Sequence, residues 1–213
     1  MLGPGYPHPV RMRDWELCRV LRAAESLAPD TRILETGSFN TYLGLFLSQR
    51  HPHVTVSDLL GARAWKSTLR TLGLAPTKKT EAGYLTWYRA MRRHGLRVLD
   101  IDLEQVRLPD GSFDCVIALS VIEHVPHVER ALAEMHRVLA PGGRLLITTD
   151  CSPEPKPMAG GVRYFGEAEL KRLFSPYTVT SPVNRPDFAR ENWCYGRETP
   201  VVTAFIEITK PRS

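Results

Sequence analysis

The sequence predicts an α/β domain with a doubly wound, mainly parallel sheet. Strand patterns alternate with helix patterns from Arg32 onward, as in successive βαβ units. The segment Phe113–Leu119 is a continuous apolar run except for Asp114, which is typical of a strand in the middle of a parallel sheet. The 213 residues suit one domain spanning 1–213, and 43% hydrophobic with 24% charged residues exclude a disordered, collagenous or coiled-coil chain.

An N-terminal arm and a helix are expected over residues 1–30. The stretch Gly3–Pro9 is rich in Gly and Pro, whereas Asp14–Ala28 carries apolar residues close to a helical period. The sequence then predicts a strand, a turn, a helix and a second strand, in this order: Arg32–Glu35, Gly37–Asn40, Thr41–Arg50 and His53–Ser57.

A basic helical insertion separates the second strand from the third. Residues 61–97 contain nine Lys or Arg residues against one acid, Glu81, although the whole chain has a net charge of only +5. Helix patterns at Ala62–Leu72 and Tyr84–Arg93 precede a third strand at Arg97–Ile101. The insertion carries Trp and Tyr among its charged residues. This composition fits two interpretations: a surface that binds an anionic or nucleic-acid partner, and an amphipathic lid. We favour the lid.

The C-terminal half continues the alternation of strands and helices. The predicted elements are the strand Phe113–Leu119, the helix Val128–Leu139, the strand Arg144–Thr149, the helix Glu167–Phe174, and the strands Tyr177–Thr180 and Val201–Thr209. The turn Pro141–Gly143 ends the first of these helices. The segments Cys151–Arg163 and Pro182–Pro200 are expected to be irregular and to help form a substrate pocket.

The chemistry is expected at the carboxyl edge of the sheet, where ligands of doubly wound folds bind. Acids follow successive strands at this edge, namely Glu35, Asp58, Asp102, Glu123 and Asp150. A carboxylate that closes the second strand can accept two hydrogen bonds from a ribose diol, and a glycine after the first strand lets the backbone approach a ligand. A single acid at the end of a strand often serves only solubility. Acids after several successive strands, however, indicate a site for a nucleoside-containing cofactor.

Four stretches resemble the class I S-adenosylmethionine-dependent methyltransferases. RILETGSFNTYLGLFLSQ resembles their first motif, and VTVSD resembles the second. LPDGSFDCVIALSVIEHVPHVERALAEMHRVLAPGGRLLIT, with its EHV segment, resembles the later half of the fold, and RYFGEAELKRLF resembles the penultimate helix. The resemblance extends over roughly Asp30–Lys210, and the longest stretch is its most specific part.

The resemblance implies a Rossmann-like seven-stranded sheet with strand order 3-2-1-4-5-7-6, in which strand 7 is antiparallel. It also implies S-adenosylmethionine as the cofactor. The residues that it assigns to the cofactor are Glu35, Thr36, Gly37 and Ser38 near the methionine part, Asp58 and Leu59 at the ribose, Asp102 and Leu103 at the adenine, and Leu119 at the amino-acid end.

The glycine-rich turn of this family is altered in the sequence. The usual G-x-G-x-G pattern is replaced by Gly37-Ser38-Phe39-Asn40-Thr41, so that one glycine of three remains. Phe39 adds bulk where the backbone normally lies close to the ligand, whereas Asn40 tolerates a positive φ. A non-catalytic scaffold on the same fold is therefore an alternative to an enzyme.

The reaction implied by the resemblance is a direct in-line displacement, in which the alignment of acceptor, methyl group and sulfur provides much of the catalysis. His124 is the candidate general base for a hydroxyl acceptor, and the alternative is that Glu123-His124 only fixes the loop. Asp150 and Tyr164 are candidate substrate residues. No metal is expected, because neither His51-x-His53 nor His124-x-x-His127 matches a known zinc spacing.

We expect a small-molecule acceptor that is methylated at a hydroxyl group, such as a sugar, a glycan precursor or a natural product. An anionic acceptor also fits this expectation. The alternative is an RNA or protein methyltransferase that uses the basic insertion, although a nucleic-acid partner is not favoured. The sequence shows neither a membrane span nor an apolar leader, and its four cysteines are widely scattered. A cytoplasmic protein is therefore expected, and the oligomeric state is not predicted.

Overall fold

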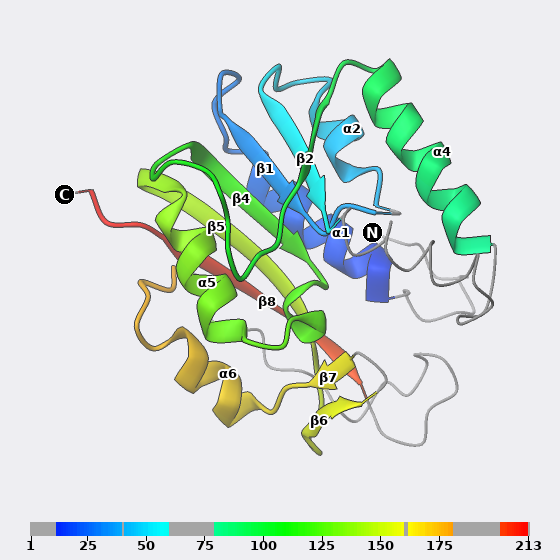
Figure 1. Ribbon diagram of the computed structural model, residues 1–213. Coiled ribbons are helices and arrows are strands. Elements are labelled where there is room, and N and C mark those ends of the chain that lie inside the picture. Colours follow the sequence, from blue (N-terminus) through cyan, green and yellow to red (C-terminus); the bar gives the residue numbers. More distant parts are fainter. Residues whose placement is uncertain (1–11, 40, 60–78, 160–161, 181–200, 213) are drawn as a thin grey trace, which may run out of the picture.

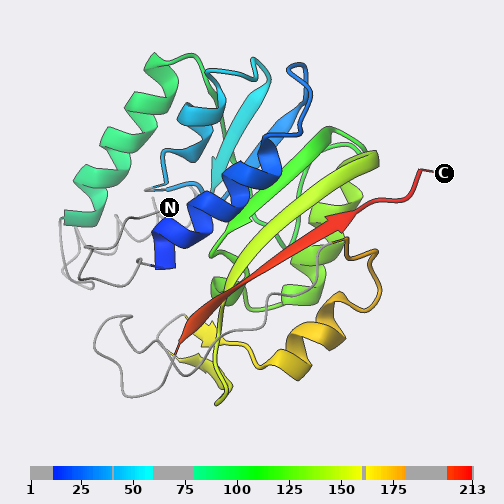
Figure 2. The ribbon, with the colours of Figure 1, turned by 180° about the vertical axis from the view of Figure 1, so that it is seen from behind.

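The computed structural model describes residues 12–39, 41–59, 79–159, 162–180 and 201–212 (Figure 1). Its centre is a six-stranded sheet with the strand order β3-β2-β1-β4-β5-β8. These strands are β1 (Ile33–Thr36), β2 (Val54–Asp58), β3 (Arg97–Asp100), β4 (Phe113–Leu119), β5 (Leu139–Cys151) and β8 (Val202–Thr209). Helices cover both faces of the sheet (Figures 1 and 2), so the predicted doubly wound α/β architecture is confirmed.

The parallel strands end together at one edge of the sheet. Glu35 of β1 lies level with Val56 of β2 and with Ile117 of β4. In contrast, β8 runs antiparallel to β5, with Thr149 opposite Ala204, as the resemblance implied for strand 7. This register places the residues that follow β1, β2 and β4 side by side at the carboxyl edge.

The predicted strand Tyr177–Thr180 is reduced to a short contact along β8. Val179 forms an antiparallel bridge with Ile208, and the backbone N–H of Thr180 donates to the carbonyl of Glu207 over 2.9 Å. The segment thus lies at the outer edge of β8, where the order 3-2-1-4-5-7-6 places strand 6. The pairing is too brief for a strand, so the described sheet has six strands instead of the expected seven.

A separate hairpin follows β5, formed by β6 (Lys156–Ala159) and β7 (Val162–Tyr164). The expectation of an irregular segment at Cys151–Arg163 was therefore wrong for its second half. Three prolines within Pro153–Pro157 conceal the strand pattern, because proline is otherwise a signal against a strand. The hairpin stands beyond the end of β5 at the carboxyl edge (Figure 1).

Among the described residues, three helices lie on one face of the sheet and two on the other, and Figures 1 and 2 show the two faces. On the first face lie α1 (Met12–Ala24), α2 (Leu43–Leu47) and α4 (Lys79–Arg93); on the second lie α5 (Val128–Arg137) and α6 (Glu167–Phe174). The predicted helices are present, but α1 and α2 are shorter than expected and α4 begins five residues earlier. The predicted helix Ala62–Leu72 lies outside the described residues.

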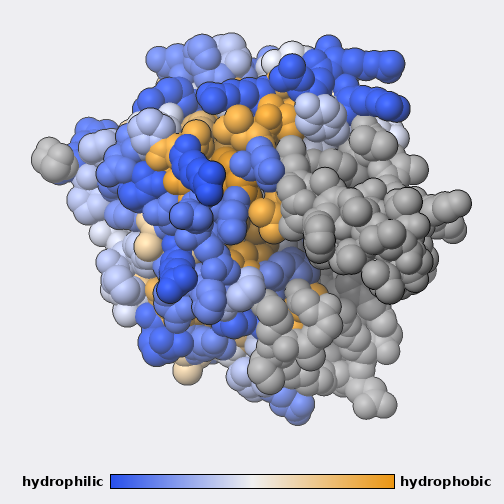
Figure 3. Space-filling view, viewed as in Figure 1, coloured by the Kyte–Doolittle hydropathy of each residue, from blue (hydrophilic) through white to orange (hydrophobic). Residues whose placement is uncertain are grey.

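The sheet separates two apolar cores, because alternate residues of each strand face opposite sides. In β4, Cys115 and Ile117 pack towards α1, α2 and α4, whereas Val116 and Ala118 pack towards α5 and α6. Between β3 and β4 the described chain crosses the second face without forming a helix. Seen from this second face, a band of apolar residues reaches the surface beside α5 and is surrounded by polar residues (Figure 3).

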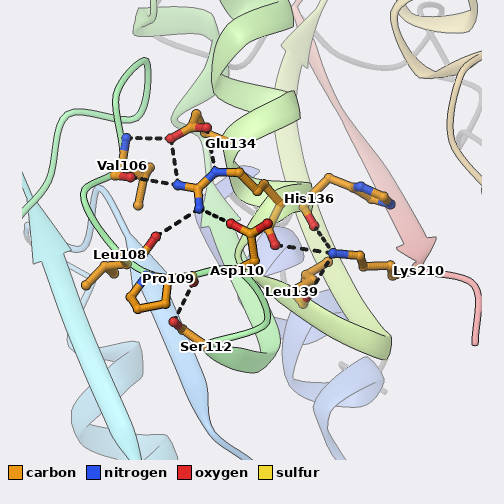
Figure 4. Close-up of polar contacts among 10 residues, drawn as sticks. Val106, Leu108, Pro109, Asp110, Ser112, Glu134, His136, Leu139 and Lys210 are labelled. Carbon is orange, nitrogen blue, oxygen red and sulfur yellow. Dashed lines mark hydrogen bonds and ion pairs between the residues drawn. The ribbon is translucent and has the colours of Figure 1, made fainter. Parts of the chain in front are cut away.

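A network around Arg137 fixes this crossing segment to α5 (Figure 4). The guanidinium of Arg137 donates to the carbonyls of Val106 and Leu108 over 2.7 and 2.9 Å and pairs with Asp110 and Glu134. The carboxylate of Glu134 in turn accepts the backbone N–H of Val106 over 2.8 Å. Because no helix forms between β3 and β4, these contacts hold that segment in place.

Lys210 stabilises the end of α5 in the same region (Figure 4). Its ammonium donates to the carbonyls of His136, Arg137 and Leu139 over 3.0, 3.2 and 2.7 Å. A cation at a helix C-terminus satisfies carbonyls that have no partner within the helix and offsets the helix dipole. The residue after β8 thus ties the last strand to α5.

Among the helices of the described segments, none has both the length and the apolarity needed to cross a membrane. The prediction of a single domain over 1–213 also concerns residues outside these segments and stays a prediction. Apart from the hairpin of β6 and β7, the described strands form one sheet, and the described helices pack in the two cores on its faces.

Candidate functional site

The turn after β1 folds onto the end of β2. Gly37 has a φ of 57°, in the left-handed region that glycine adopts without strain. The backbone N–H and the hydroxyl of Ser38 both donate to the carbonyl of Ser57 over 3.0 Å. The backbone N–H of Phe39 then donates to Oδ2 of Asp58 over 3.1 Å. The turn therefore retains a defined shape although two of the family's glycines are missing; Asn40 itself lies outside the described residues.

Gly37 is also required by a neighbour in the turn that follows β4. A Cβ atom at this position would lie 2.6 Å from Cγ2 of Val121, closer than side chains can approach. The turn after β1 is thus in direct contact with the turn after β4. The hydroxyl of Thr36 donates to the carbonyl of Ile117 over 3.1 Å, and the side chains of Thr36 and Ser38 are both buried.

Glu35 anchors the start of α2 from inside the molecule. Its side chain is 1% exposed; Oε2 accepts the backbone N–H of Gly44 over 2.7 Å and Oε1 accepts the hydroxyl of Thr41. Burial raises the pKa of Glu35 to about 7, against the opposing effect of these hydrogen bonds. A Cβ atom at Gly44 would lie 2.8 Å from Oε2, so this glycine makes room for the carboxylate. The helix begins at Leu43 rather than at Thr41, because Tyr42 before it has a φ of 53°, which is not a helical conformation.

Asp58 presents a fixed carboxylate at the end of β2. The side chain is 5% exposed, and its two oxygens accept the backbone N–H groups of Leu59 over 2.8 Å and of Phe39 over 3.1 Å. A carboxylate has about four acceptor positions, and these two backbone bonds orient that of Asp58. The side chain of Leu59 itself is 43% exposed.

The segment after β3 lies beside Asp58. The backbone N–H of Ile101 donates to the carbonyl of Asp58 over 3.2 Å. Asp102 is exposed, and its Oδ1 accepts the backbone N–H of Glu104 over 2.9 Å, whereas Leu103 is buried in the core on the α5 side. The structure therefore brings the two residues assigned to the adenine next to the residue assigned to the ribose.

The end of β4 is held by a left-handed residue. Ser120 has a φ of 50°, and its backbone N–H donates to the hydroxyl of Thr148 over 3.0 Å and to the carbonyl of Thr148 over 3.1 Å. Leu119 is buried, and its carbonyl lies 3.5 Å from Nη1 of Arg13. The backbone that was assigned to the amino-acid end of the cofactor thus lies beside a cation from α1.

Glu16 of α1 was not singled out in the sequence. Its side chain is 2% exposed, accepts the hydroxyls of Ser120 and of Thr148, the latter over 2.9 Å, and pairs with Arg13 over 3.1 Å. The only sequence signal is an acid within an amphipathic helix, since its partners lie more than 100 residues away. These contacts fix α1 across the carboxyl edge between β4 and β5.

Glu123 and His124 are neighbours in the sequence, but Glu123 is buried and His124 is exposed. Both lie in the short helix η1 (Ile122–His124), where His124 is exposed and Glu123 is 1% exposed. Oε2 of Glu123 accepts the hydroxyl of Thr149 over 2.9 Å. Burial, and next the charge of Asp150, raise the pKa of Glu123 to about 8. Glu123 thus fixes the loop, as the alternative reading expected, and the catalytic role of His124 stays a prediction.

The two candidate substrate residues, Asp150 and Tyr164, lie in β5 and β7. Asp150 is half-buried near the end of β5, level with Thr203 of β8. The backbone N–H of Phe165 donates to the carbonyl of Asp150 over 3.2 Å, which places the preceding residue, Tyr164 of β7, close to it. Within the described segments no group of three His, Cys, Asp or Glu residues is arranged to hold a metal ion.

The described half of the basic insertion is amphipathic. Trp87 of α4 is 1% exposed, whereas Arg89, Arg92 and Arg93 are exposed. The helix precedes β3, so its C-terminal residues lie towards the amino ends of the strands. Arg92 and Arg93 are therefore remote from the edge that carries Asp58. Their exposure beside the buried Trp87 is the pattern that the lid interpretation describes.

The comparisons with known proteins agree with this geometry. A family described as a methyltransferase domain matches residues 70–147. The ubiquinone/menaquinone biosynthesis C-methyltransferase UbiE of Brucella canis is 31% identical over 100 residues, which cover 47% of this chain and 31% of the relative. The same enzyme of Methylobacterium nodulans is 58% identical over 43 residues, covering 20% of this chain and 17% of the relative. The chain thus spans about a third or less of the length of these curated relatives.

Solved structures show the same fold at low sequence identity. An S-adenosylmethionine-dependent methyltransferase from Mesorhizobium loti has a TM-score of 0.59 and 17% identity, covering 92% of this chain and 98% of that one. A Burkholderia thailandensis 1,6-didemethyltoxoflavin-N1-methyltransferase with bound S-adenosylhomocysteine has a TM-score of 0.61 and 16% identity, covering 94% and 78%. The [4+2]-cyclase SpnF has a TM-score of 0.64 and 16% identity, covering 92% and 82%.

The chain thus has the fold and the strand order of the class I S-adenosylmethionine-dependent methyltransferases, and its residues 70–147 match a methyltransferase domain family. S-adenosylmethionine is the cofactor of this class.

Proposed function

We propose that this chain transfers the methyl group of S-adenosylmethionine to a hydroxyl group of a small-molecule acceptor. The observation that carries the proposal is the carboxylate of Asp58, which two backbone N–H groups orient at the end of β2. The matching methyltransferase family and a neighbour that acts on 1,6-didemethyltoxoflavin, a small molecule, support methyl transfer to an acceptor of this size.

The residues at the carboxyl edge fit the cofactor by the chemistry of their donors and acceptors. Asp58 would accept the ribose hydroxyls, and Asp102 with the backbone of Leu103 would contact the adenine. The carbonyl of Leu119 would accept the ammonium of the amino-acid end, and the guanidinium of Arg13, which is 50% exposed, would pair with the carboxylate. The backbone of Gly37 would lie against the methionine part. When bound, the cofactor supplies a methyl group already activated by its sulfonium.

The acceptor would lie over the ends of β4 and β5, beside the hairpin of β6 and β7. His124 would take the proton of an acceptor hydroxyl, while Asp150 and Tyr164 would orient the acceptor. An amine or carbon acceptor would need different proton handling, so the choice of a hydroxyl depends on this role of His124. A cytoplasmic location belongs to the same proposal and is supported by three free cysteines among the described residues: Cys18, Cys115 and Cys151.

A function without methyl transfer is the second candidate. The altered turn at Phe39 favours it, and SpnF shows that a chain of this fold is described as a cyclase. Against it, the turn keeps a defined shape and its backbone supports Asp58. The RNA or protein alternative has less support, because Arg92 and Arg93 lie at the opposite edge of the sheet.

The test is to follow tritium from the labelled methyl group into three fractions of a cell extract. The purified chain is incubated with labelled S-adenosylmethionine and with a small-molecule filtrate, the RNA fraction or the protein fraction. We expect label in the filtrate and formation of S-adenosylhomocysteine. Label in RNA or protein would contradict the small-molecule acceptor. Binding of S-adenosylhomocysteine without transfer into any fraction would favour the second candidate.

A further inference from the structure

The side chain of Phe39 does not occupy the ligand's side of the turn but packs on α4. Its ring lies edge-to-face against Trp87, with ring centroids 6.2 Å apart and an interplanar angle of 87°. This geometry is favourable for two aromatic rings, because the positive edge of one meets the negative face of the other. Trp87 is 1% exposed and belongs to the core formed by α1, α2 and α4.

The backbone of the same residue reaches the ribose site. The N–H of Phe39 donates to Oδ2 of Asp58 over 3.1 Å. A single residue therefore joins the helix of the basic insertion to the carboxylate that is expected to bind the ribose. In the family's usual pattern a glycine stands at position 39, so this link depends on the altered turn.

We propose that Trp87 is a positioning residue for ribose recognition, which acts through Phe39 on the carboxylate of Asp58. The inference rests on the proposed function, because it concerns the same cofactor site. The turn has lost two glycines. Besides the bonds of Ser38 to Ser57, two further contacts hold it: the hydroxyl of Thr41 donates to Glu35 on one side, and the ring of Phe39 packs against Trp87 on the other. The second contact fixes the direction of the Phe39 N–H and with it the orientation of Asp58.

This role explains why the insertion carries a buried tryptophan beside exposed arginines. A helix that only shielded the sheet would need apolar bulk at position 87, whereas a positioning helix needs an aromatic ring that meets Phe39. The altered turn and the helix α4, which carries Trp87, are thus parts of one arrangement. Loss of the ring is expected to affect ligands with a ribose diol more than ligands that lack one of its hydroxyls.

The experiment measures the affinity of the purified chain for S-adenosylhomocysteine and for its 2′-deoxy analogue by calorimetry. The wild-type chain is expected to bind the full ligand about tenfold more tightly, since a hydrogen bond to a charged group is lost in the analogue. Trp87→Leu is expected to reduce this ratio to less than about threefold, and Trp87→Phe is expected to restore most of it. Met91→Ala, a change in the same buried core, is the matched control that lowers stability but leaves the ratio unchanged.

An unchanged ratio in a folded Trp87→Leu variant would overturn the inference, and so would an equal loss in Met91→Ala. If Trp87→Leu does not fold, Phe39→Leu tests the same contact from the more exposed side, because it removes the ring and keeps the backbone N–H. Retention of the wild-type ratio in that variant would likewise overturn the inference. Absence of S-adenosylhomocysteine binding by the folded wild-type chain would instead contradict the proposed function.

Discussion

Glu16 of α1 and Thr148 of β5 share a hydrogen bond of 2.9 Å although 132 residues separate them in the chain. The same carboxylate accepts the hydroxyl of Ser120 and pairs with Arg13, so it joins α1 to the ends of β4 and β5. A buried carboxylate is tolerated only with such partners, because its desolvation is otherwise costly. The helix that precedes the sheet is therefore part of the candidate site.

Glu16→Ala is expected to lower the free energy of unfolding by about 1–3 kcal/mol, because the buried hydroxyls of Ser120 and Thr148 lose their acceptor. Urea denaturation followed by circular dichroism measures this change. Glu25→Ala, which removes an exposed acid just after α1, is the control and should change the stability by less than about 0.5 kcal/mol. Equal stability of the two variants would contradict the anchoring role.

Arg13→Gln is expected to weaken the binding of S-adenosylhomocysteine about tenfold, because the carboxylate of the ligand loses a charged partner beside Leu119. Binding of 5′-methylthioadenosine, which lacks the amino-acid end, should not change. Arg22→Gln removes an exposed arginine of the same helix and serves as the control. A similar loss for both ligands would show that Arg13 acts on the fold rather than on the carboxylate.

The stability of the chain is expected to depend on pH through Glu123. Its pKa is raised from 4.5 in the unfolded chain to about 8 in the folded one, first by burial and then by Asp150. The folded state therefore holds the proton more tightly, and the associated stability is full below about pH 4.5 and is lost as the pH rises through about 8. Glu123→Gln keeps a neutral side chain and should lose less stability than the wild type between pH 6 and pH 9.

Urea midpoints at pH 6 and pH 9 measure the effect of Glu123. Glu35, whose pKa is about 7, has the same sign and is present in both proteins, so it cancels in the comparison. Parallel loss of stability in wild type and Glu123→Gln would contradict a buried neutral carboxyl at this position.

The fold followed from patterns that depend on neighbours in sequence. The apolar run Phe113–Leu119 and the alternation around it predicted the central strands, because periodicity reports which face of an element is buried. The hairpin at β6 and β7 was missed because its prolines conceal a strand pattern. A seventh strand was predicted at Tyr177–Thr180, but only a short contact with β8 forms there. A sequence pattern does not show how many backbone hydrogen bonds a segment makes.

The site was predicted at the level of strand ends but not of side-chain partners. Asp58 followed from its position at the end of β2, and its carbonyl accepts the backbone N–H of Ile101, the residue before Asp102. Glu16 could not be identified from the sequence, because its role arises from contacts with distant residues. Likewise, the bulk of Phe39 was taken as an obstacle to the ligand, and only the fold shows that its ring packs on Trp87.

Calorimetric titration with S-adenosylhomocysteine tests the central claim, that the carboxyl edge around Asp58 holds the cofactor. We expect micromolar binding by the wild-type chain and a loss of at least about fivefold in Asp58→Ala, corresponding to about 1 kcal/mol. Asp30→Ala, an exposed acid in the turn before β1, should bind as the wild type does. No binding by folded wild-type protein, or unchanged affinity in folded Asp58→Ala, would contradict the account.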